Sequence, residues 1–197
     1  HPADGPEDRG LGERCVNFGV PKLGAGYNSY RQIVQTADHV AVYHEMAHDI
    51  RIIPLDERPP VDGDIRQWNG VPRGWWDGDM LVVDTIGMND QTWVDNYRTP
   101  HSDKLHVVEH YRIVRGSPDL IRVEHIPVDT YFVDPENEVL QVIAWIEDPD
   151  TFRAPYAVMQ VYERATEIFK EIICQENNDD RFGQGLVPVP SDSTPDF

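Results

Sequence analysis

The stretch Gly74-Trp75-Trp76-Asp77-Gly78-Asp79-Met80-Leu81-Val82-Val83-Asp84-Thr85 decides the fold class of this chain. Asp-Gly is a preferred dipeptide for the tight turns that join antiparallel strands. The residues on both sides of this turn are rich in aromatic and β-branched types, which favour strands. The stretch therefore predicts a β-hairpin, with one strand before Asp77 and a second strand after Asp79.

Similar short apolar runs lie on both sides of the hairpin, and the 16 prolines and 14 glycines fall mainly between them. We expect strands at Tyr30–Gln35, Val40–Ala47, Asp49–Leu55, Leu105–Val114, Leu120–Pro127, Val139–Ile146 and Tyr156–Glu163. Ile168–Cys174 is either a last strand or a short helix. Strands in hairpin order, without a long helical period, predict an all-β fold: an antiparallel meander closed into a calycin-like barrel. A β-sandwich is the alternative.

We expect one domain over residues 15–176, with an N-terminal arm over residues 1–14 and a C-terminal tail over residues 177–197. The predicted strand Val139–Ile146 is apolar on both faces, whereas a barrel strand is normally apolar on one. A loop, a terminal arm or a partner subunit must then cover its outer face. Self-association is expected through this strand or through the terminal arms.

The chain has 35 acidic and 17 basic residues, which gives a net charge of −18. Such a charge argues against nucleic-acid binding, which depends on basic side chains that neutralise phosphates. There is no apolar run long enough to suggest insertion into a membrane. The first residue, His1, fits a trimmed secretory precursor, so we expect a secreted protein, extracellular or periplasmic. In such a protein Cys15 and Cys174 form a disulfide, or they are two buried free thiols.

One motif, His44-Glu45-Met46-Ala47-His48, matches the H-E-x-x-H signature of zinc proteases. That chemistry requires a helix, on which His44 and His48 would share one face and one zinc ion. The β-branched residues around the motif favour a strand, in which residues four apart lie roughly 13 Å from each other. We therefore disfavour metal binding at His44 and His48, and we expect no cofactor.

The order of several motifs resembles a family of exported bacterial β-rich proteins that has no established activity. The matching stretches are Glu13-Arg14-Cys15 with Phe18-Gly19-Val20-Pro21, Glu45-Met46 with His48, Arg51-Ile52-Ile53-Pro54-Leu55-Asp56, Gly74–Thr85 and Leu105-His106-Val107-Val108-Glu109. The resemblance covers about residues 13–178. It implies a secreted β-rich protein with a similar cysteine pair, but it implies no reaction.

Ionisable residues interrupt the apolar strands in the segments that carry this resemblance. Glu45, His48, Arg51 and His106 are the candidate catalytic residues, because together they supply a base, an acid and an anion-binding guanidinium. The candidate ligand-binding residues are Trp68, Trp76, Arg66 and Glu109. Strand alternation places Glu109 with Tyr111, on the face opposite His106, so not all of these side chains can enter one cavity.

These observations lead to three hypotheses of function. The first is a secreted β-barrel that binds a small organic or carbohydrate-like ligand, with acid–base chemistry of the lyase, isomerase or hydrolase kind as an extension. The second is an extracellular structural protein that assembles with itself into filaments or a surface layer. The third is a zinc hydrolase that uses His44 and His48.

Overall fold

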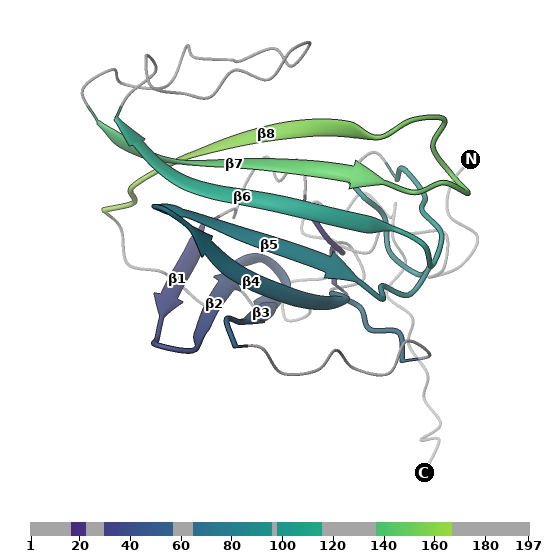
Figure 1. Ribbon diagram of the computed structural model, residues 1–197, viewed down its shortest axis with the longest axis horizontal. Helices are drawn as coiled ribbons and strands as arrows, with labels where there is room; N and C mark the ends of the chain where they lie inside the picture. Colours follow the sequence, from purple (N-terminus) through teal and green to yellow (C-terminus); the bar gives the residue numbers. More distant parts are fainter. Residues whose placement is uncertain (1–16, 23–29, 57–64, 96–97, 116–136, 167–197) are drawn as a thin grey trace, which may run out of the picture.

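The computed structural model describes residues 17–22, 30–56, 65–95, 98–115 and 137–166. They form two antiparallel sheets (Figure 1). The small sheet contains β1 (Arg31–Gln35), β2 (His39–His44) and β3 (Ile50–Pro54) in that order. The large sheet contains β4 (Val71–Asp77), β5 (Met80–Ile86), β6 (His106–Arg115), β7 (Glu138–Glu147) and β8 (Tyr156–Glu163), also in chain order. The all-β class is therefore confirmed.

The hairpin that decided the fold class is β4–β5. Asp77 pairs with Met80, so only Gly78 and Asp79 form the turn. Gly78 has a φ of 63°, a left-handed conformation that a glycine adopts without steric cost. The prediction of a tight turn at this place is confirmed.

Strand alternation gives the large sheet an inner face, which packs against the small sheet. Val40, Val42 and Ile53 of the small sheet form one core cluster with Leu81, Val83, Tyr111 and Val142 of the large sheet. A second cluster covers the other half of this inner face with residues from the connecting segments. It contains Val20, Met88, Val94, Leu105, Val107, Ala144 and Ile146. The core thus lies between two layers, as in a sandwich.

The described residues do not form a closed barrel, because no ladder joins the small sheet to the large one. β3 and β4 nevertheless approach closely at Gly74. A Cβ atom at this position would lie 2.7 Å from Ile53 Cγ2 and 2.9 Å from Leu55 Cδ2. A sandwich-like arrangement, the alternative from the sequence, is compatible with these sheets. Leu120–Pro127, Ile168–Cys174, both cysteines and both terminal arms lie outside the described residues.

β7 is largely buried on both faces, as its sequence predicted, although Trp145 is 44% exposed. Val139, Gln141 and Ile143 point to one face, and each is at most 4% exposed. Val142 and Ile146, on the other face, are at most 2% exposed. This burial exists within a single chain, so these residues do not require a partner subunit to leave water.

Candidate functional site

A buried ion pair connects the two sheets. Arg51 of β3 and Glu109 of β6 lie on facing inner surfaces, and their side chains are 6% and 1% exposed. Arg51 Nη1 donates to Glu109 Oε2, and Arg51 Nη2 donates to Thr85 Oγ1 at 2.5 Å. The Tyr111 hydroxyl donates to Glu109 Oε1 at 2.9 Å. Burial is the largest influence on the pKa of Arg51 and would lower it, but the charges of Glu109, Tyr111 and Asp49 and the hydrogen bond to Glu109 together raise that pKa, so the guanidinium stays charged.

A second layer of polar groups adjoins this pair. Lys22 forms an ion pair with Asp49, and Asn69 Nδ2 donates to Asp49 Oδ1 at 2.9 Å. His44, at the end of β2, lies nearby, and its pKa is far below the ordinary value. The main cause is burial, and the cations Lys22, Arg31 and Arg51 add to it. His44 is therefore a neutral imidazole at physiological pH.

The space left inside this polar cluster is too small for a substrate. Lys22, His44, Arg51, Glu109 and Tyr111 line a void of about 10 Å³. Such a volume holds one water molecule at most. The polar interior that we predicted is present, but it connects the sheets and does not form an open site.

The four candidate catalytic residues do not form one site. Arg51 is part of the buried cluster, whereas His106 lies on the outer face of the large sheet, with Nε2 2.9 Å from Asp84 Oδ1. Glu45 is 5% exposed, and its Oε2 accepts a hydrogen bond from the Tyr30 backbone N–H at 3.4 Å. His48 follows β2 in a short turn. The combination of base, acid and guanidinium therefore does not gather around a single cavity.

The H-E-x-x-H segment is neither the α-helix of a zinc protease nor the strand that we expected. β2 ends at His44, and η2 (Met46–His48) is a single 3-10 turn. Ala47 and His48 have φ values of 62° and 50°, which a regular α-helix does not contain. In the part of the chain that the structure describes, no group of three or more His, Cys, Asp or Glu residues is arranged to hold a metal ion.

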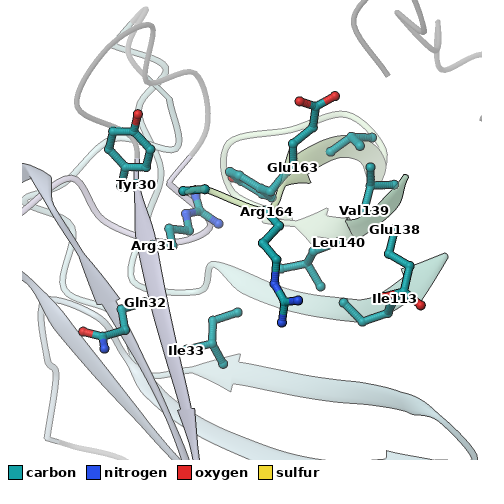
Figure 2. Close-up of a pocket in the computed structure, with 13 residues that line it drawn as sticks. Tyr30, Arg31, Gln32, Ile33, Ile113, Glu138, Val139, Leu140, Glu163 and Arg164 are labelled. Carbon is teal, nitrogen blue, oxygen red and sulfur yellow. The ribbon is translucent and has the colours of Figure 1, made fainter. Parts of the chain in front are cut away.

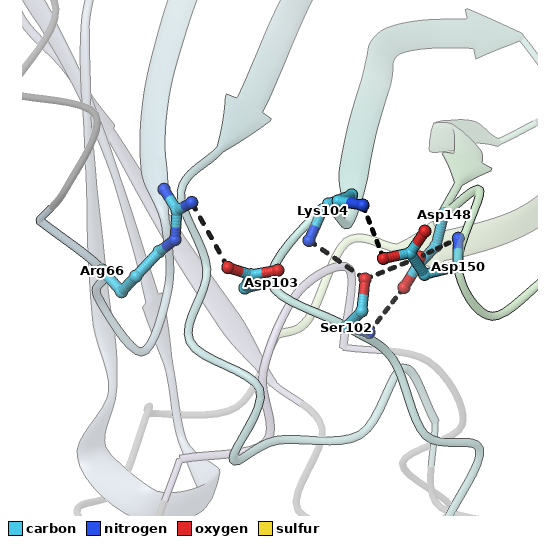
Figure 3. Close-up of polar contacts among 6 residues, drawn as sticks. All are labelled: Arg66, Ser102, Asp103, Lys104, Asp148 and Asp150. Atoms are coloured by element: carbon cyan, nitrogen blue, oxygen red, sulfur yellow. Dashed lines mark hydrogen bonds and ion pairs between the residues drawn. The ribbon is translucent and has the colours of Figure 1, made fainter.

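The predicted aromatic walls and Arg66 lie at the surface. Trp68 and Trp76 are 41% and 45% exposed. Arg66 Nη2 lies 3.5 Å from Asp103 Oδ2 in an exposed ion pair (Figure 3). An exposed pair of this kind contributes little to stability. Of the predicted ligand-binding residues, only Glu109 is buried.

Figure 3 also shows a polar network that joins the segment before β6 to the turn after β7. The Ser102 backbone N–H and hydroxyl both donate to the Asp148 carboxylate, at 2.6 and 2.8 Å. Lys104 Nζ lies 2.7 Å from Asp150 Oδ2. Burial would raise the pKa of Asp148, but the hydrogen bonds from Ser102, Thr151 and the Asp150 backbone together outweigh it and lower that pKa. The network fixes this turn.

A groove that sequence reasoning missed lies between β1 and the strands β6, β7 and β8 (Figure 2). Its volume is about 830 Å³, and it is partly open to solvent. Ile33, Ile113, Val139, Leu140 and Val161 supply its apolar surface. Tyr30, Arg31, Gln32, Tyr162 and Arg164 are among its polar lining residues. No motif could have revealed it, because its walls come from β1 and from strands that lie far from β1 in the chain.

Arg31 links this groove to the buried cluster, since it lines both the groove and the small void. Its guanidinium lies over the Tyr162 ring, 4.4 Å from the ring centroid, and its Nη2 donates to the Lys22 carbonyl oxygen at 3.2 Å. Burial raises the pKa of Tyr162 to about 12. The contact between them is therefore a cation over a neutral phenol ring.

No family model, curated protein or solved structure matches this chain. The resemblance to exported bacterial proteins therefore stays a prediction. None of the helical segments in the described part of the chain has the length and apolar character needed to cross a bilayer.

Proposed function

We propose that this protein is a secreted binding protein, and that it holds a small organic ligand in the groove between β1 and β8. The observation that carries this proposal is the groove itself. Its volume of about 830 Å³ lies within the usual range of ligand pockets, roughly 300–1,000 Å³. Its mixture of aliphatic walls and a few polar side chains is also typical of such pockets. In the predicted barrel, the seam between β1 and β8 would be the opening to the interior.

Binding fits the geometry better than catalysis. Glu45, His48, Arg51 and His106 are not among the described residues that line the groove. The buried cluster has ionisable groups, but its void of about 10 Å³ admits no substrate. We therefore propose no acid–base step.

A substitution that fills the groove tests this proposal. Ile113 is 57% exposed and lines the groove, so Ile113→Trp should occupy part of the space without disturbing the core. Two fluorescent probes with the same aromatic body, anilinonaphthalene sulfonate and phenylnaphthylamine, serve as ligands. We expect saturable binding of at least one probe, weakened about tenfold or more in Ile113→Trp, which corresponds to about 1.4 kcal/mol.

The matched control is Ile52→Trp. Ile52 is 50% exposed on β3 and does not line the groove, so this variant should bind the probes as the unmodified protein does. The proposal fails if neither probe binds saturably, or if both tryptophan variants behave alike.

Self-assembly is the second candidate, and the edge of β1 favours it. Among the residues that the structure describes, β1 pairs only with β2, and its Ile33 and Val34 are 43% and 49% exposed. A free edge strand with exposed apolar side chains can pair with another chain. Electron microscopy and light scattering test this function. Filaments that disappear in Val34→Lys would support it, whereas monomers at all concentrations would exclude it.

A further inference from the structure

The groove contains two arginines that have no carboxylate partner among the residues that the structure describes. Neither Arg31 nor Arg164 forms an ion pair with any acidic residue within the described ranges. Four other basic side chains do have such partners: Lys22 with Asp49, Arg51 with Glu109, Arg66 with Asp103 and Lys104 with Asp150.

Both guanidinium groups have donors to spare. An arginine has five N–H donors, and Arg31 uses one of them for the Lys22 carbonyl. Figure 2 shows the side chains of Arg31 and Arg164 entering the space between β1 and the large sheet, whereas the Glu163 side chain turns away from them. Glu138 and Glu163 balance the charge of the two arginines, so the groove is neutral overall, but the arginine N–H donors remain available to a ligand.

The rest of the groove suits an apolar body. Ile33, Ile113 and Leu140 lie around the arginines in Figure 2, and Val161 and Ala165 also line the space. The Tyr162 ring under Arg31 holds that guanidinium in place, which reduces the side-chain entropy lost when an anion binds. An arginine fixed over an aromatic ring beside aliphatic walls is suited to a ligand with an acid group on an apolar frame.

We propose that the ligand of the groove is a small amphipathic anion, whose carboxylate or other acid group binds Arg31 and Arg164 while its apolar part packs on Ile33, Ile113 and Leu140. This inference rests on the proposed function, because it names the ligand class of the same site. The ligand would then have a fixed orientation in the groove: its acid group would lie at the arginines, and its apolar part would pack along β1, β6 and β7.

The two probes named above separate this inference from the proposed function. Anilinonaphthalene sulfonate and phenylnaphthylamine share one aromatic body, and only the first has an anionic group. We expect the sulfonate to bind about tenfold more tightly than the neutral amine at low ionic strength, and the difference to shrink as salt screens the arginines.

Arg31→Gln and Arg164→Gln should each reduce this preference, and Arg66→Gln, which removes an exposed arginine outside the groove, should leave it intact. Arg164 is exposed at the end of β8, so its variant keeps the test valid if Arg31→Gln does not fold. Thermal unfolding curves check the fold of each variant.

The outcomes are distinct. Equal or tighter binding of the neutral amine, still blocked by Ile113→Trp, overturns the anion inference and leaves the proposed function standing. The inference also fails if both glutamine variants keep the preference for the sulfonate. Binding of neither probe means that the proposed function fails first.

Discussion

Glu109→Leu is the substitution that most directly tests how the two sheets are held together. It would leave the Arg51 guanidinium, 6% exposed, buried without its counter-charge. Removal of one partner of a buried ion pair costs about 3–5 kcal/mol. The Tyr111 hydroxyl would also lose its acceptor, which adds about 1 kcal/mol. We therefore expect Glu109→Leu to cost about 4 kcal/mol or more, a large share of the 5–15 kcal/mol typical of a domain.

The double variant Arg51→Met/Glu109→Leu should be more stable than Glu109→Leu alone. It removes both charges from the interior, and replacement of a buried ion pair by apolar residues of similar volume is often neutral. The remaining cost is the loss of partners for the hydroxyls of Thr85 and Tyr111, about 1–3 kcal/mol each at most. A double-mutant cycle should give a coupling energy of about 2–3 kcal/mol between Arg51 and Glu109.

Urea denaturation monitored by tryptophan fluorescence measures these free energies of unfolding, provided that the m-values of the variants agree. If Glu109→Leu costs less than about 1 kcal/mol, the pair is solvated or is not formed, and the reasoning is refuted. A direct contact between the two side chains would also be contradicted if the losses of stability in the two single variants sum to the loss in the double variant.

Three further predictions concern other parts of the chain. Gly74→Ala should cost about 1–3 kcal/mol, because its Cβ would lie 2.7 Å from Ile53 Cγ2; an unchanged urea midpoint would show that β3 and β4 are not so close. Because its pKa is lowered in the folded protein, Asp148 stabilises the fold at pH values above its ordinary pKa of 3.8, and this contribution is lost as the pH falls below 3.8 toward the lowered pKa. The free energy of unfolding of Asp148→Asn should lack this part of the pH dependence. Cys15 and Cys174 should form a disulfide worth roughly 5 kcal/mol in the chain-entropy model, and two thiols that react in the unfolded, unreduced protein would exclude it.

Local sequence signals predicted much of the fold. The Asp77-Gly78 dipeptide located the hairpin of β4 and β5, because two-residue hairpin turns require particular backbone angles. The β2 strand was extended too far, to Ala47, because nothing in its sequence indicates the positive φ angles of Ala47 and His48. Non-glycine residues adopt such angles only where the surrounding structure imposes them, so sequence reasoning has no access to them.

The site was predictable only in part, for a related reason. Strand alternation correctly placed Glu109 and Tyr111 on one face of β6 and His106 on the other. It could not pair Glu109 with Arg51, because that contact joins residues 58 positions apart and depends on how the two sheets pack. The groove depends on the same packing, because it lies where β1 and β8 do not pair with each other.

The buried ion pair and the groove are therefore two consequences of one arrangement. Arg51 fixes β3 over β5 and β6, and the ladders of the small sheet transmit that position to β1. Arg31 of β1 then lies at the wall between the void and the groove, with the Tyr162 ring of β8 below it. The position of β1 at the groove therefore depends on the contacts of Arg51 in β3, at the opposite edge of the small sheet. The polar cluster has no room for a ligand, but it helps to position the strand that lines the groove in which we propose that a ligand binds.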